Sequence, residues 1–150
     1  MYKTILVPLD GSTLAEAILP HVEQLAALCG ASVIFLQVIE LPHLVPDKGE
    51  GFEALPHLSA ADVEKQVNDA QTYLEALTER VRDNGLTAHF RVEYGPIVTT
   101  ILRLAEQEAV DLIAMASHGR GGLTDVYYGS VAGGVLQRID RPLLIVRTRP

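Results

Sequence analysis

Short apolar runs alternate with helix-like stretches along the whole chain, and this alternation limits the fold more than any other feature. The apolar runs, each as long as a buried strand, lie at 4–10, 32–40, 87–94, 110–117 and 141–148. Stretches with helical spacing of apolar residues lie between them, at 13–30, 59–85, 96–109 and about 130–139. Strands that are apolar on both faces and joined by helices belong to a parallel sheet covered on both sides. We therefore predict an α/β fold: a single-domain, Rossmann-like, open five-stranded parallel sheet.

Glycine and proline mark the ends of the predicted helices. Gly30 and Gly85 are expected to end the helices that precede them, and Pro96 to occupy a first helical turn. Ser59 is expected to cap the longest helix. Pro20 falls inside the stretch 13–30, so we expect a kink in the middle of that helix.

Length and charge exclude several classes of protein. A chain of 150 residues with 48% hydrophobic residues is long enough for one domain, here 1–150, and short for two. Its formal net charge of -7 argues against nucleic acid and anionic lipid as partners. No apolar run is long enough to span a bilayer. The single Cys29 has no internal disulfide partner, and with no signal-peptide pattern we expect a soluble protein in the reducing cytoplasm.

The predicted ligand site lies at the carboxyl ends of the strands, where open parallel sheets bind their ligands. The loops that matter there follow Leu9, Val38 and Ala116. The segment 41–58 contains three prolines and two glycines, which predicts a long loop. We expect a loop of this length to serve as a lid, a binding element or a mobile connection.

The loop after Ala116 is rich in glycine but fits neither familiar phosphate-binding pattern. A dinucleotide fingerprint would need glycine where Thr124 stands, and the P-loop ending Gly-Lys-Ser/Thr occurs nowhere. What remains is Gly119, nine residues, then Gly129 and Ser130 leading into a helix. The free N–H groups of Ser130 and Val131 in that first turn form an anion site, backed by the helix dipole. The alternative is that Gly129 and Ser130 only cap the helix.

At these residues the chain resembles the universal stress protein family. The matching stretches are "PLDGS" after the first strand and "VDLIAMASHGRGGLTDVYYGSVAGGVLQRIDRPLLIV" near the end, and the resemblance covers essentially the whole chain. The ATP-binding branch of that family carries G-x2-G-x9-G-[S/T]. This sequence matches it at Gly119, Gly129 and Ser130 and departs from it at the first glycine, which is Ala116 here.

The resemblance implies an adenine nucleotide alpha hydrolase-like fold with an adenine nucleotide across the carboxyl ends of the strands. ATP is the implied ligand, and ADP or AMP are alternatives that the resemblance does not distinguish. Mg would bind to the phosphates. Asp10 would lie against the nucleoside, or else serve as a turn residue, and the Val38 backbone would meet the adenine. Carried over residue by residue, the implied binding set is Pro8, Asp10, Val38, Ala116, His118, Gly119, Arg120, Gly129, Ser130 and Val131.

No pattern of catalytic or metal-ligating residues accompanies this site. The five histidines show no H-E-x-x-H spacing, and no G-x-S-x-G elbow is present. His118 is read as a structural loop residue in preference to an acid or base. We therefore expect neither a protein-held metal nor an assigned catalytic residue.

Two features near the carboxyl terminus lead to further expectations. The last strand is predicted to lie at a sheet edge, where an apolar strand needs a partner. Proteins resembling this one commonly dimerise there, so we expect a homodimer through the last strand. Gly133 and Gly134 fall inside the final helix, which we expect to be loosely held until a nucleotide binds.

Three function classes follow from the sequence. The favoured one is an ATP-binding sensor or regulator in a stress response, acting on a protein partner. The alternatives are a slow adenine-nucleotide hydrolase and a nucleotide-free dimeric interaction module.

Overall fold

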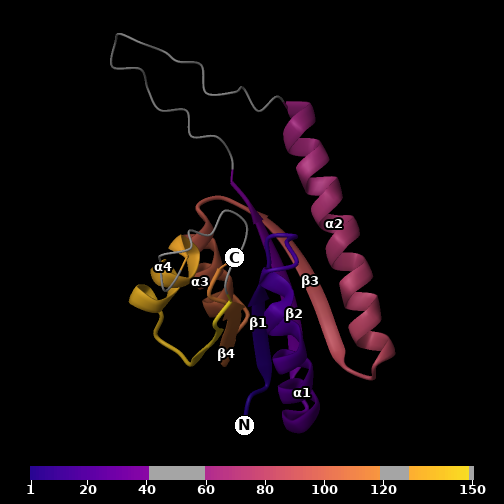
Figure 1. Cartoon of the computed structure of the whole chain (residues 1–150), viewed down its shortest axis with the longest axis vertical. Helices are drawn as coiled ribbons and strands as arrows, with labels where there is room; N and C mark the ends of the chain where they lie inside the picture. Colours follow the sequence, from indigo (N-terminus) through magenta and orange to yellow (C-terminus); the bar gives the residue numbers. More distant parts are fainter. Residues whose placement is uncertain (41–59, 119–128, 149–150) are drawn as a thin grey trace.

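The computed structural model describes residues 1–40, 60–118 and 129–148, which form one parallel sheet covered by helices (Figure 1). The strand order is β3-β2-β1-β4-β5, so the chain reverses its direction of progress between β1 and β4. This arrangement confirms the predicted fold class. No helix in the described ranges is both long and apolar enough to cross a membrane. The strands are β1 (Thr4–Pro8), β2 (Ser32–Ile39), β3 (Thr87–Tyr94), β4 (Leu112–Ala116) and β5 (Leu143–Val146).

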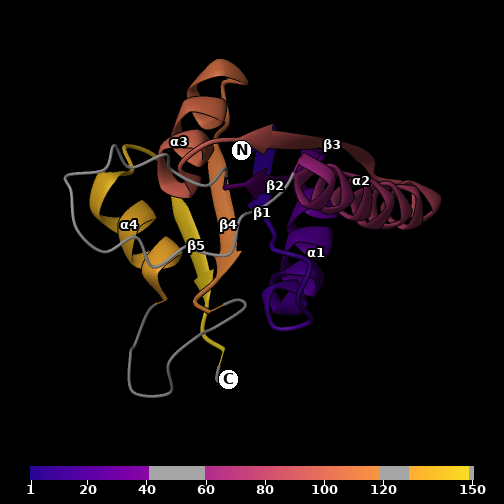
Figure 2. The same ribbon diagram turned by 90° about the horizontal axis from the view of Figure 1, so that it is seen from above.

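Helices cover both faces of the sheet, as Figure 2 shows from above. One face carries α1 (Leu19–Cys29) and α2 (Ala60–Asp83), and the other carries α3 (Ile97–Gln107) and α4 (Ser130–Arg138). Successive residues of the central strands point to opposite faces. Thus Ile5 and Val7 belong to one apolar cluster, whereas Leu6 belongs to the other. This is why the strands read as continuous apolar runs.

Glycine ends two helices as predicted, but Pro20 acts differently from our expectation. Gly30, at φ 66°, and Gly85, at φ 87°, follow α1 and α2 in the left-handed conformation that glycine adopts readily. The predicted single helix over 13–30 with a kink at Pro20 is wrong. The structure has a short 3₁₀ helix, Ala15–Ile18, and α1 then starts with Pro20 in its first turn. A first-turn N–H has no partner within the helix, so proline fits there without kinking it.

The two edge strands of the sheet differ in character. Exposed and partly buried residues dominate β3, contrary to the expectation that every strand is apolar on both faces. Arg91 of β3 pairs with Glu93 at 2.6 Å and with Glu108 at 2.8 Å. The opposite edge is β5, as predicted, and its four residues are all apolar and only partly buried. The predicted loop 41–58 and the Ser59 cap lie outside the described residues.

The two adjacent glycines of α4 have different surroundings. A Cβ added at Gly134 would lie 2.8 Å from Val98 Cγ2 of α3, so glycine permits the close packing of these two helices. A Cβ at Gly133 would meet nothing within 4 Å. Helix packing therefore explains the glycine at 134, which the sequence alone did not reveal. At 133 no close neighbour requires a glycine, so this residue only lowers the helix propensity.

Replacing Gly133 with alanine should stabilise the protein, whereas the same change at Gly134 should not. Alanine is favoured over glycine in a helix interior by about 0.5–1 kcal/mol. For a chain of this size, thermal unfolding should show the Gly133→Ala variant melting about 1–4 °C higher. In Gly134→Ala the contact with Val98 offsets the gain. Equal stabilisation by both substitutions would contradict the described α3–α4 packing.

Candidate functional site

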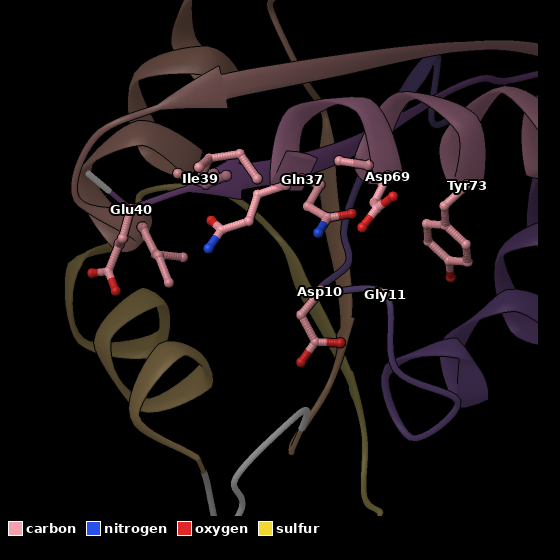
Figure 3. Close-up of a pocket in the computed structure, with 11 residues that line it drawn as sticks. Asp10, Gly11, Gln37, Ile39, Glu40, Asp69 and Tyr73 are labelled. Carbon is pink, nitrogen blue, oxygen red and sulfur yellow. The ribbon is translucent and has the colours of Figure 1, made fainter. Parts of the chain in front are cut away.

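A pocket of about 570 Å³ opens at the carboxyl edge of the sheet, between the ends of β1 and β2 and the helix α2 (Figure 3). Its position is the one predicted for a ligand in an open parallel sheet, beside the reversal of strand order. The residues that line it are Asp10, Gly11, Gln37, Val38, Ile39, Glu40, Gln66, Asp69, Ala70, Tyr73 and Ile97.

The Val38 backbone faces the crevice at the end of β1. The ladder between β1 and β2 ends at Pro8 and Leu36, after which the Leu9 N–H donates to the Leu36 carbonyl at 2.8 Å. In a strand, every second residue directs its N–H and C=O to the same neighbour, so Val38 faces the β1 side as Leu36 does. Among the described residues, no β1 group pairs with it there. Val38 therefore offers one donor and one acceptor to a ligand, a feature that no side-chain pattern can reveal.

Asp10 lies both in a turn and on the pocket wall. Its Oδ1 accepts hydrogen bonds from the Ser12 N–H at 2.9 Å and from the Ser12 hydroxyl at 2.5 Å, and the intervening Gly11 has φ 83°. This is the turn role that the sequence allowed for Asp10. Because the carboxylate also lines the pocket, the turn fixes an acceptor at the end of β1. Pro8 is the last residue of β1, two positions before it.

Five polar side chains of the pocket were not predicted as site residues, and one of them, Glu40, directly follows β2. Gln37 comes from β2, whereas Gln66, Asp69 and Tyr73 come from α2, which passes beside the strand ends. One signal was present in the sequence, since Gln37 is the polar residue that interrupts the apolar run Val33–Ile39. The three residues of α2 lie on its largely exposed half, where polar residues are ordinary.

Tyr73 places a neutral hydroxyl beside the turn that holds Asp10. Burial raises the pKa of Tyr73 above its usual value, and the carboxylates of Glu16 and Asp10 raise it further. The phenol therefore keeps its proton throughout the physiological range and remains a hydrogen-bond donor.

The end of β4 is tied to the end of β5 by a buried polar cluster of Ser117, His118 and Thr148. The Thr148 N–H donates to Ser117 Oγ at 2.9 Å, and the His118 N–H donates to Thr148 Oγ1 at 3.2 Å. His118 Nδ1 lies 3.1 Å from the Thr148 carbonyl oxygen. Because a carbonyl oxygen can only accept a hydrogen bond, Nδ1 is the ring nitrogen that carries the hydrogen in this contact. His118 is 4% exposed. The expected structural role of His118 agrees with these contacts.

The start of α4 is held against the same strand end. The Gly129 N–H donates to the Ser117 carbonyl at 2.7 Å, and a Cβ on Gly129 would lie 3.0 Å from that oxygen. Gly129 has φ −65°, so it is the close approach to β4, and not a left-handed conformation, that favours glycine here. No side chain caps α4 within the described residues, and its first-turn N–H groups at Ser130 and Val131 point outward from the helix end. They form the donor array predicted from the sequence.

The substitution of alanine for the family's first glycine does not distort β4. Ala116 is the last residue of the strand, pairs with Val146 and is not among the described residues with positive φ. A glycine is therefore not required at 116 for backbone conformation. The structure thus brings Pro8, Asp10, Val38, Ala116, His118, Gly129, Ser130 and Val131 to one edge of the sheet, whereas Gly119 and Arg120 lie outside the described residues.

Three buried side-chain atoms lack a hydrogen-bond partner in the part of the chain that the structure describes. They are Gln37 Oε1 and Tyr73 OH in the pocket, and His118 Nε2 just after the end of β4. Unpaired buried polar atoms are rare in folded proteins because each carries a desolvation cost of about 1–3 kcal/mol. A polar ligand would supply the missing partners. The residues present therefore fit a ligand with polar groups, while no cluster of three or more metal-ligating side chains occurs within the described ranges.

Comparison with known proteins places the chain among universal stress proteins. The model of the universal stress protein family matches residues 1–147. The universal stress protein MJ0577 of Methanocaldococcus jannaschii is 31% identical over 99% of this chain and 97% of its own length. Sll1388, a universal stress protein of Synechocystis, is 25% identical over 97% of this chain and 98% of its own.

Solved structures agree with the fold. The structure of MJ0577 has a TM-score of 0.82 at 30% identity, with 99% of this chain and 98% of that chain covered. A universal stress protein in complex with cAMP has a TM-score of 0.64 at 21% identity, covering 97% of each chain. One from Archaeoglobus fulgidus in complex with dAMP has a TM-score of 0.66 at 19% identity, covering 96% of this chain and 97% of that one. Two solved proteins of this fold are thus nucleotide complexes, one with cAMP and one with dAMP.

Proposed function

The chain belongs to the universal stress protein family, and from this premise we propose that it binds ATP and acts as a nucleotide-dependent sensor or regulator in a stress response. The observation that carries the proposal is the order of the binding groups along the sheet. The Val38 backbone on β2 suits a base, Asp10 at the end of β1 suits a sugar, and the α4 start beside β4 suits phosphates. A nucleotide has its parts in this order.

The charges of the pocket support this orientation of the nucleotide. Its described lining contains three carboxylates, on Asp10, Glu40 and Asp69, and no lysine or arginine. Phosphates are repelled from such a pocket, whereas hydroxyl and amino groups find acceptors there. The N–H groups at the start of α4, which have no partner in the described part of the chain, attract phosphates instead. We propose that Mg²⁺ binds to those phosphates and not to protein side chains. Phosphate oxygens bind Mg²⁺ readily, and the described residues contain no group of three or more metal-ligating side chains.

A regulatory role is favoured over catalysis by the surroundings of His118. Its Nδ1 is engaged by Ser117 and Thr148, and its ring is buried, so among the described residues it is held as part of the fold. Slow hydrolysis remains an alternative that turnover measurements address. A nucleotide-free interaction module is the other alternative, and the ordinary strand conformation of Ala116 gives it no support from the backbone.

We also propose that the protein forms a homodimer through β5. This strand is a sheet edge whose four residues, Leu143–Val146, are all apolar and partly buried, whereas the opposite edge, β3, carries the ion pairs of Arg91. The backbone N–H and C=O groups on the outer side of an apolar edge strand can pair with another strand. A second copy of the same strand is the partner that the proposal names.

Nucleotide binding is tested by removing a single N–H group from the start of α4. Ser130 is the first residue of the helix, a position that proline occupies well, so Ser130→Pro deletes the N–H and leaves the helix start intact. The wild-type protein should melt roughly 5–11 °C higher with Mg-ATP at about 100 times its dissociation constant. In Ser130→Pro the affinity for ATP should fall by about tenfold or more, because a hydrogen bond to a charged group is lost.

Ser130→Ala is the matched control for this experiment. It removes the side-chain hydroxyl but keeps the N–H, so its affinity for ATP should stay closer to that of the wild type. Calorimetric titration of all three proteins measures the difference. Equal affinity in Ser130→Pro and Ser130→Ala would refute the proposed phosphate position, and absence of binding to the wild type would refute the proposed function.

Sedimentation velocity tests the proposed homodimer. At micromolar concentration the wild-type protein should sediment as a dimer, since the apolar edge of β5 is then covered. A monomer throughout that concentration range would rule out β5 as a stable dimer interface.

A further inference from the structure

Gln37 is the polar side chain of β2 that enters the candidate pocket. Figure 3 shows it on the side of the pocket opposite Asp10, with Asp69 of α2 beside it. Its Oε1 is buried and has no hydrogen-bond partner among the described residues. Two carboxylates, on Asp10 and Asp69, share the pocket with it. These acceptors cannot satisfy Oε1, whereas a donor carried by a ligand would satisfy it.

The position of Gln37 assigns it to the base end of the site. It directly precedes Val38, whose backbone N–H and C=O face the crevice, and both lie on β2. The phosphate donors at Ser130 lie on the far side of β1, beside β4. A nucleotide with its phosphates at α4 therefore brings its base, and not its phosphates, to Gln37.

The primary amide of glutamine is complementary to one edge of adenine. It offers an acceptor, Oε1, beside a donor, Nε2, and these match the 6-amino group and N7 of the base. A 6-oxo purine presents two acceptors on that edge, so in either orientation of the amide one group is mismatched. The 6-amino group has two hydrogens, and hence one can bind the Val38 carbonyl while the other binds Gln37.

We propose that Gln37 is a specificity-determining residue, which selects 6-amino purines by accepting from the 6-amino group and donating to N7. This inference rests on the proposed nucleotide binding and adds a contact to the same site. The carboxylates of Glu40 and Asp69 act in the same direction, because they favour an amino group over a carbonyl oxygen nearby.

The test compares ATP, 7-deaza-ATP and inosine triphosphate on the wild-type protein and on Gln37→Met. The wild type should bind ATP about tenfold more tightly than 7-deaza-ATP, which lacks only the N7 acceptor. In Gln37→Met the affinity for ATP should fall, and ATP and 7-deaza-ATP should bind equally. The preference for ATP over inosine triphosphate should shrink without disappearing, since Val38 still distinguishes the two bases.

Two further variants complete the experiment. Gln71→Met is the matched control, because Gln71 is an exposed glutamine of α2 outside the pocket lining, and it should keep the wild-type preferences. Gln37→Glu keeps the shape and an acceptor but lacks the donor to N7, so it should also lose the preference for ATP over 7-deaza-ATP. Gln37→Glu thus replaces Gln37→Met in the test if Gln37→Met fails to fold.

The outcomes separate this inference from the proposed function. ATP binding by the wild type with an unchanged 7-deaza-ATP ratio in both Gln37 variants would overturn the role of Gln37 and leave the proposed function standing. Failure of the wild type to bind ATP would overturn both.

Discussion

The reversal of strand order between β1 and β4 is the constraint on which the rest of this structure depends. Crossovers run outward from that point in both directions, so the connections from β1 and β4 leave opposite faces of the sheet. Within the described ranges no connection covers the strand ends there, and Val38 extends past the end of β1 with its backbone groups directed to the β1 side. The site is thus a consequence of topology before any side chain is considered.

Buried polar groups around these strand ends divide into satisfied and unsatisfied sets. Ser117 and Thr148 bond one another and His118, and together they hold the end of β4 against the end of β5 and the start of α4. Gln37 Oε1, Tyr73 OH and the second ring nitrogen of His118, Nε2, in contrast, lack partners among the described residues. The satisfied set makes the frame rigid, and the unsatisfied set carries a cost that a bound polar ligand would remove.

The sequence predicted the fold well because its signals were local and periodic. Strand β3 was predicted to the residue, and Gly30 and Gly85 ended the helices that precede them, because glycine adopts positive φ readily. Pro20 was misjudged, since the sequence does not say whether a proline lies inside a helix or begins a new one.

The site was predicted only in part, for a physical reason. Motif spacing located the β1 and β4 ends and the start of α4, where backbone geometry depends on glycine. Residues of α2 reach the pocket through tertiary packing, which leaves no mark on an exposed polar helix face. The packing role of Gly134 was hidden in the same way, because it depends on the distance to Val98 on another helix.

The central claim is that one nucleotide spans β2, β1 and β4, with its base at Val38 and its phosphates at the start of α4. Backbone amide shifts in a ¹⁵N NMR titration with Mg-ATP test it most directly. If one nucleotide spans these strands, the largest shifts should fall together on Val38, Gly11, Ser130 and Val131, with a common dissociation constant. Shifts at α4 without any at Val38, or shifts confined to residues away from this edge, would contradict it.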